Sequence, residues 1–162
     1  AYSPLTNVMY VPLRNTCAEG TAVAESRKKT SLYGVAYKQA QVAPDNGRNV
    51  GTIYAISAET GVTAWKFEQR AGTMSVVATG GGLLFGGDVN GRFRAFDQRS
   101  GKVLWEINLG SPVTGYPISY AVDGKQYVAV STGVSLTQSG LSGLTPELRP
   151  STGNNLFVFA LP

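Results

Sequence analysis

The chain has 162 residues, of which 43% are hydrophobic and 15% charged, with a formal net charge of +4. This length suits one domain or part of a larger one, and the 20 glycines favour short strands and tight turns over long charged helices. There is no histidine, which excludes a Ser-His-Asp triad, a histidine-ligated zinc site and covalently bound c-type haem.

The remaining global features exclude little more. The single cysteine, Cys17, has no partner in the chain for a disulfide or a Cys-x-x-Cys site. Positive charge is dense only at residues 25–30 (ESRKKT), where we expect a solvated loop, with an acidic docking partner or an exposed protease site as alternatives. The charge is otherwise scattered, so nucleic-acid binding is not predicted. No apolar run reaches the length of a membrane span. The abrupt start suggests a piece of a longer protein, so the lack of a visible leader does not predict location.

In chain order, the first predicted element is a strand pair within residues 3–15 (SPLTNVMYVPLRN), whose earlier strands are missing. A variable loop is expected at residues 18–48. Two similar units follow, at residues 51–69 and 91–109, and each places two apolar runs around a turn that contains glycine. This pattern is typical of a β-hairpin. The two tryptophans occupy matching positions, Trp65 and Trp105, forty residues apart.

The segments between and after these units also predict strands. Residues 73–79 and 81–88 are apolar runs separated by glycines, and residues 117–132 form two alternating runs around Asp-Gly. A third, partial copy of the unit closes the chain at residues 154–162. Four strands per forty residues is typical of a propeller blade, and no helical periodicity is evident. We therefore predict an all-β fold of about three blades from the C-terminal part of a larger ring.

A rigid aromatic side chain that recurs once per blade suggests a repeated joint between blades. A tryptophan on the outer strand would lie against the neighbouring blade, where its burial is worth roughly 25 cal/mol per Å². Two unrelated core tryptophans are the alternative. Two or three isolated blades would leave open sheet edges, so we expect residues 157–161 to pair with a strand from the far N-terminus of the full protein.

The units that end in tryptophan resemble the tryptophan-docking motifs of the pyrroloquinoline-quinone (PQQ) dependent alcohol dehydrogenases, which are eight-bladed periplasmic propellers. Residues 1–17 (AYSPLTNVMYVPLRNTC) are similar to the strand and loop that carry an active-site asparagine in that family. Residues 71–105 resemble its penultimate blade, and residues 115–133 resemble its last complete strand pair. The likeness omits residues 18–48 and 135–153, which are treated as variable loops. Residues 1–162 as a whole are taken as the C-terminal part of one propeller domain.

The resemblance implies oxidation of primary or secondary alcohols or sugar alcohols, with PQQ as cofactor and Ca²⁺ or a lanthanide as metal. It also implies a cytochrome c or a quinone as electron acceptor, a periplasmic location, and the N-terminal part of the propeller as partner. The family's catalytic aspartate and metal ligands lie on earlier blades, so no catalytic residue and no metal ligand is predicted in this chain. The alternative is a non-catalytic scaffold propeller, such as an outer-membrane assembly factor.

Four residues are predicted to bind the cofactor. Asn15 matches the family asparagine that hydrogen-bonds the quinone oxygens through its amide, and its alternative role is to cap a turn. Arg70 stands where some relatives carry a tryptophan, and is suited to a PQQ carboxylate, with a surface arginine as the alternative. Ser135 and Leu136 replace an aromatic position and are expected to reach the cofactor through their backbone N–H groups. The carboxylates beside glycines, Asp88, Asp97, Asp123 and Glu59, are attributed to turn formation.

Overall fold

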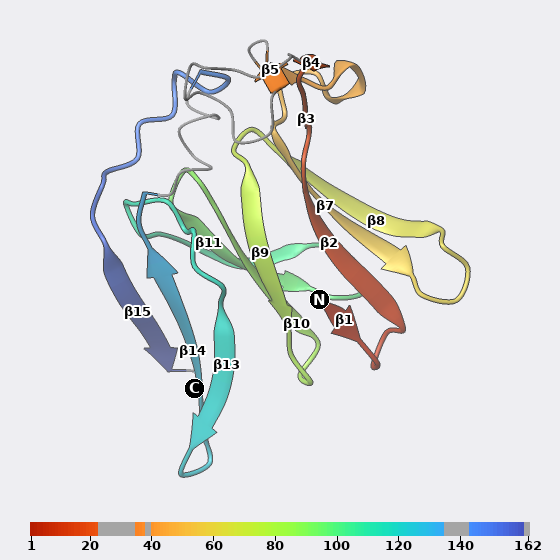
Figure 1. Cartoon of the computed structure of the whole chain (residues 1–162). Coiled ribbons are helices and arrows are strands. Elements are labelled where there is room, and N and C mark those ends of the chain that lie inside the picture. Colours follow the sequence, from red (N-terminus) through yellow and green to blue (C-terminus); the bar gives the residue numbers. More distant parts are fainter. Residues whose placement is uncertain (23–34, 38–39, 135–142, 161–162) are drawn as a thin grey trace.

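The computed structural model describes residues 1–22, 35–37, 40–134 and 143–160, and the regular secondary structure of these residues is almost entirely β-strand. Helical structure in this part is limited to a single 3-10 turn at Pro44–Asn46. Three antiparallel sheets fan out next to one another (Figure 1), and we call them blades A, B and C in chain order. Within the described part, no helix is long and apolar enough to cross a membrane. The predicted all-β fold of about three blades is therefore confirmed.

Blade A combines strands that are distant in sequence. Its order is β1-β2-β7-β8, with bounds Tyr2–Ser3, Val8–Arg14, Gly51–Ser57 and Thr63–Gln69. The long connection from β2 to β7 contains two small pairs. These are β3 with β6 and β4 with β5, at Thr16–Cys17 with Gln41–Val42 and Gly20–Ala22 with Val35–Tyr37. The pairing of β2 with β7 ends where Arg14 faces Gly51, so the residues just beyond this pair lie together at one end of the blade.

Blade B is the four-stranded meander that the forty-residue period predicts. Its strands pair in the order β12-β11-β10-β9, with β9 at Thr73–Ala78, β10 at Leu83–Asp88, β11 at Arg92–Asp97 and β12 at Val103–Asn108. Blade C has three described strands, in the order β13-β14-β15, at Ile118–Val122, Lys125–Thr132 and Asn155–Ala160. Among the described residues β15 pairs only with β14, so the outer edge of blade C is open.

The sequence repeat has a direct structural cause. In blade A the residue opposite Trp65 is Ala55, and in blade B the residue opposite Trp105 is Ala95. Each ladder shifts register immediately after that alanine. A residue as small as alanine leaves space for the indole on the same face of the sheet, because directly opposed side chains are neighbours. The repeated Ala–Trp pair therefore records a cross-strand packing requirement.

The joint between blades A and B centres on Trp65. Its Nε1 donates a 3.0 Å hydrogen bond to the backbone oxygen of Gln98 in blade B, which also accepts a 2.9 Å bond from the hydroxyl of Tyr10. A Cβ atom added to Gly101 would lie 2.6 Å from the indole, so the ring rests directly on that glycine. The predicted docking of this tryptophan on the next blade is thus confirmed.

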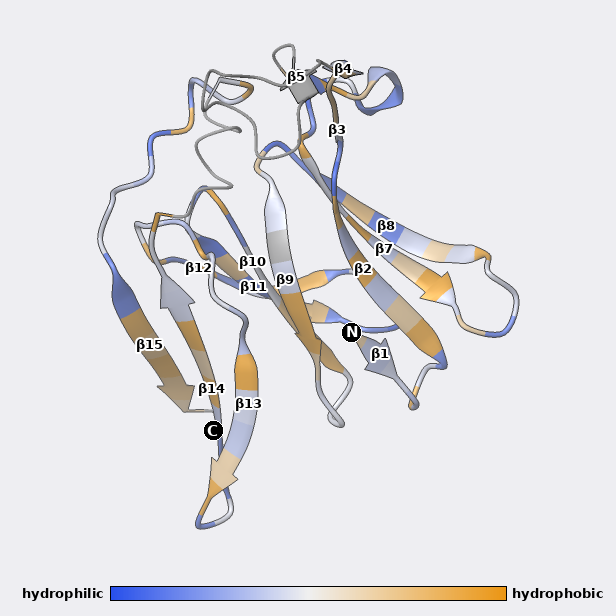
Figure 2. Ribbon diagram, viewed as in Figure 1, coloured by the Kyte–Doolittle hydropathy of each residue, from blue (hydrophilic) through white to orange (hydrophobic). Residues whose placement is uncertain are grey.

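The two larger clusters of the hydrophobic core lie between the blades. The first joins blades A and B around Tyr10, Ile53, Leu84 and Phe96. The second joins blades B and C, with members that include Phe85, Phe93, Val113, Val128 and Val130. Figure 2 shows the corresponding hydrophobic segments within strands such as β2, β9 and β14. Each blade is thus stabilised mainly by apolar contacts with its neighbours.

Candidate cofactor site

Asn15 lies between β2 and β3, at the end of blade A that also carries the long excursion (Figure 1). Its side chain is only 8% exposed. Its backbone N–H donates to the oxygen of Val50 at 2.8 Å, so the chain leaving β2 is paired with the chain entering β7. Nδ2 donates to the backbone oxygen of Asn49 at 3.2 Å and to Oγ1 of Thr52 at 2.6 Å.

These two bonds decide what the Asn15 side chain can offer. The Asn49 carbonyl can only accept a hydrogen bond, so the atom of the Asn15 amide that faces it is Nδ2. The two hydrogens on Nδ2 are both used within the protein, one by Asn49 and one by Thr52. Any further hydrogen bond must therefore be accepted by Oδ1. Donation to a quinone oxygen, as the resemblance implies, requires one Nδ2 bond to open. The bond to Thr52 is the one made to a side chain, whereas the acceptor of the other bond is a backbone carbonyl.

Arg70 lies beside the same residues, but its guanidinium is directed at the protein. Nε donates to Oε1 of Glu147 at 2.5 Å and Nη2 to Oε2 at 3.2 Å, which makes a bidentate ion pair. Nη1 donates to the backbone oxygen of Arg48 at 2.6 Å, and Nη2 also donates to the oxygen of Leu144. The hydrogen bond from Arg70 lowers the pKa of the Glu147 carboxyl. Contact between Arg70 and a cofactor carboxylate stays a prediction.

The other two predicted contacts, Ser135 and Leu136, lie outside the described residues. Cys17 is exposed and carries a free thiol. The described residues include no group of three or more histidine, cysteine or acidic side chains that could hold a metal ion.

Two of the four carboxylates beside glycines, Asp88 and Asp97, form the hydrogen bonds expected of turn residues. Oδ1 of Asp88 accepts bonds from the backbone N–H groups of Asn90 and Arg92, and Oδ2 pairs with Arg94 at 2.8 Å. Asp97 accepts from two backbone N–H groups and from the hydroxyl of Ser100, and that hydroxyl bond is the main reason why its pKa is lowered.

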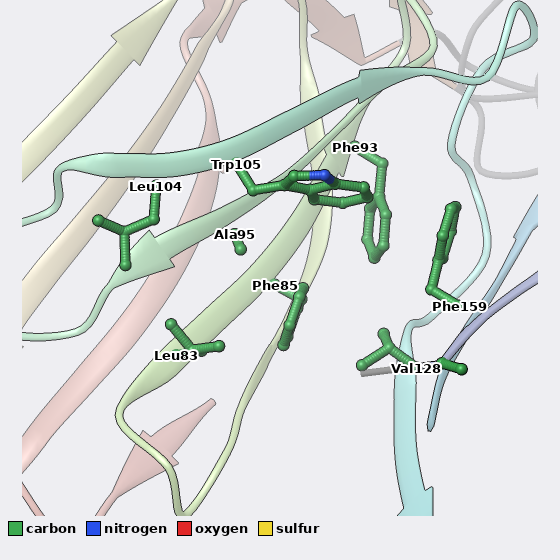
Figure 3. A pocket seen from close by; sticks show the side chains of 9 residues that line it. Leu83, Phe85, Phe93, Ala95, Leu104, Trp105, Val128 and Phe159 are labelled. Atoms are coloured by element: carbon green, nitrogen blue, oxygen red, sulfur yellow. The ribbon is translucent and has the colours of Figure 1, made fainter. Parts of the chain in front are cut away.

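An apolar cavity among the described residues lies elsewhere, at the seam between blades B and C. It measures 420 Å³ and is lined by aromatic and aliphatic side chains that include Phe85, Phe93, Trp105 and Phe159 (Figure 3). Trp105 contacts Phe159 of blade C edge-on, with ring centroids 5.3 Å apart, yet it is 40% exposed. The lining has no titratable group, so the cavity suits packing of a further apolar element and offers no acid or base.

Three residues of the Asn15 site were missed by sequence reasoning: Asn49, Thr52 and Glu147. One indirect sign was that both repeat units begin with a glycine, Gly51 and Gly91. A Cβ atom at Gly51 would lie 2.3 Å from the oxygen of Ala71. The chain is therefore tightly packed beside Thr52. No sequence pattern predicts the ion pair between Glu147 and Arg70, which lie 77 residues apart.

The comparisons with known proteins agree with this architecture. Residues 70–128 match the family model for the glucose/ethanol/alcohol dehydrogenase β-propeller domain, under the heading PQQ. The chain is 32% identical over its full length to a quinoprotein ethanol dehydrogenase of Pseudomonas putida, of which it covers 26%. The chain is therefore similar over its own full length to quinoprotein alcohol dehydrogenases, and its fold is that of a propeller segment.

Two further relatives define the extent of the match. A lanthanide-dependent methanol dehydrogenase of Methylacidiphilum fumariolicum is 37% identical over 83% of this propeller segment and 22% of its own length. The solved structure of a europium-containing methanol dehydrogenase superposes on 99% of the chain and 32% of its own, with a TM-score of 0.83 and 31% identity. The segment therefore spans about a quarter of the length of the first curated relatives it matches.

Proposed function

We propose that this chain forms one side of the cofactor-binding end of a larger propeller that uses PQQ to oxidise primary or secondary alcohols or sugar alcohols. The observation that supports this most strongly is the full-length similarity to quinoprotein alcohol dehydrogenases. It includes the loop that carries Asn15. No feature of the described residues favours the alternative of a non-catalytic scaffold propeller.

The described residues offer polar contacts to only one edge of a bound cofactor. The buried side chain of Asn15 is held by the hydrogen bonds from Nδ2 to Asn49 and Thr52, and Oδ1 remains to accept a further bond. Tight packing at Gly51 keeps the backbone beside Thr52 in place. The metal, Ca²⁺ or a lanthanide, would need oxygen ligands, and no acidic cluster exists in the described part. Metal ligands and the catalytic base are therefore proposed to come from the rest of the propeller.

When bound, PQQ with its metal ion supplies the acceptor for the two electrons that leave the alcohol. The contribution of this chain is to bind and orient. Asn15 presents Oδ1 to a ligand donor in the arrangement described here. It becomes a donor only when the Nδ2 bond to Thr52 opens, so Thr52 would tune which role Asn15 takes.

The proposed partners follow from the same comparison. The open edge of β15 and the cavity beside Trp105 suit a closing strand from the remaining part of the propeller. One relative is named a 1-butanol dehydrogenase (cytochrome c), which supports a cytochrome c as electron acceptor here, with a quinone as the other candidate. A periplasmic location belongs to the same proposal.

The direct test is reconstitution of the full-length protein with PQQ and either Ca²⁺ or a lanthanide. Dye reduction is then measured with primary alcohols, secondary alcohols and sugars. We expect bound quinone and dye reduction with at least one of these substrates. A protein that retains no quinone and reduces no dye with any of them would refute the proposal.

A second test concerns Asn15. We expect Asn15→Ala to weaken PQQ binding about tenfold, the loss of one hydrogen bond to a ligand, while far-UV circular dichroism is unchanged. The control is Asn108→Ala on β12, where an exposed amide caps a turn by accepting from the N–H of Gly110. Equal PQQ affinity in both variants would remove Asn15 from the site.

A further inference from the structure

A segment of blade C crosses to blade A at the end of the molecule that carries Asn15. We define the strap as residues 143–151, within the connection from β14 to β15. Figure 1 shows the start of this segment at the same end as β3 to β6. The strap is therefore placed to influence the candidate cofactor site from a different blade.

The strap is attached at two points. At one end, Ser151 donates its N–H to the oxygen of Gly110 at 2.8 Å, and its hydroxyl lies 2.6 Å from that of Ser111. At the other end, Glu147 pairs with Arg70, and the oxygen of Leu144 accepts a bond from the same guanidinium. These attachments join the strap to the connection between blades B and C and to blade A.

Packing reinforces the second attachment. Leu144 and Leu148 pack against a small hydrophobic cluster formed by Val50, Ala71 and Val89. Val50 has no exposed surface. The backbone oxygen of Val50 accepts the N–H of Asn15. The strap therefore packs against a residue that is hydrogen-bonded directly to Asn15.

Hydrogen bonds connect Glu147 to Asn15 by a second route. The Arg70 side chain that Glu147 orients donates to the oxygen of Arg48, and the Arg70 backbone oxygen accepts the N–H of Val50 at 3.3 Å. Arg70 thus holds the stretch from Arg48 to Val50 at both ends. This stretch also contains Asn49, whose carbonyl accepts from Nδ2 of Asn15.

We infer that Glu147 is a positioning residue, which acts through Arg70 to hold the backbone that fixes Asn15. This inference deepens the proposed function and rests on it only for the role of Asn15 toward PQQ. The ion pair is bidentate, which gives it directional strength that a simple surface pair lacks. Loss of the Glu147 carboxylate would leave Arg70 free to change rotamer and release Arg48.

The experiment compares Glu147→Ala with Glu106→Ala in the full-length protein. Glu106 is a matched control because it also bridges arginines, Arg92 and Arg94, with comparable exposure, and lies on the outer strand β12. The first readout is hydrogen exchange of the backbone amides of Asn15 and Val50 without cofactor. The second is equilibrium binding of PQQ, with Ca²⁺ present, to the apoprotein.

We expect Glu147→Ala to speed exchange at both amides and to weaken PQQ binding, each about fivefold, the size expected for one well-formed ion pair. Glu106→Ala should change neither, and Glu147→Asp should recover part of both. Unchanged exchange at Asn15 and Val50 in Glu147→Ala would overturn the inference. If the wild-type protein binds no PQQ, the proposed function fails, and the exchange comparison still decides whether Glu147 positions Asn15.

Discussion

The docking of Trp65 on Gly101 makes a quantitative prediction about stability. Gly101 has φ +71°, a conformation that costs an L-residue about 1–2 kcal/mol. An added Cβ atom would also lie 2.6 Å from Cε3 of the indole. Overpacking of a tight contact typically costs about 1–3 kcal/mol. We therefore expect Gly101→Ala to reduce the free energy of unfolding by about 2–5 kcal/mol, from these two costs together.

The control for this variant is Gly124→Ala. Gly124 has φ +77° and no atom within 4 Å of the added Cβ position, so only the backbone cost of about 1–2 kcal/mol applies. Urea denaturation followed by circular dichroism measures both variants. A third comparison places Gly101→Ala in a Trp65→Ala background, where the collision is absent and the cost should fall to that of the control. Equal losses for Gly101→Ala and Gly124→Ala, or the same loss with and without the indole, would refute the docking argument.

Three further predictions concern turns and the second blade joint. Asp88→Ala should cost about 3 kcal/mol, because it breaks a buried ion pair with Arg94 and leaves the backbone N–H groups of Asn90 and Arg92 without their acceptor, whereas Asp97→Ala on an exposed turn should cost less by the same urea assay. Ser100→Ala should raise the pKa of Asp97 toward its ordinary value of 3.8, measured by carboxyl NMR titration. Because the pKa of Asp97 is lowered in the folded state, its contribution to stability is present above 3.8 and lost as pH falls through the lowered value. The wild-type advantage over Ser100→Ala should therefore vanish in acid, and an advantage that persists would contradict this reasoning. Gly87→Ala places a Cβ atom 2.2 Å from the side chain of Val113 and should cost about 2 kcal/mol, with partial rescue by Val113→Ala; no rescue would show that the seam is not the cause.

Much of the fold could be predicted because its determinants are local. Strands and hairpins are specified within short windows of sequence by alternating apolar residues, by glycine turns and by the forty-residue repeat. The positions of Trp65 and Trp105 predicted a repeated joint between blades, and Trp65 forms it. Trp105 also contacts the next blade, through Phe159, but it borders a cavity at the seam between blades B and C, where the described part of blade C supplies no turn equivalent to that of Gly101.

The candidate site was less predictable because its contacts join distant segments. Residue type and family resemblance marked Asn15, but its hydrogen-bonding role depends on Asn49 and Thr52, which reach it only when β2 pairs with β7. Arg70 was predicted to contact a cofactor carboxylate, and its pairing with Glu147 was not foreseen. No local pattern encodes that pair.

The sequence by itself determined the blade, its strands, its turns and the place of its tryptophans, since these depend on side-chain alternation and on glycine conformations over a few residues. Only the tertiary structure decided which polar atoms are used within the protein and which remain for a ligand. That choice depends on the path of long connections, which bring donors and acceptors together from different blades.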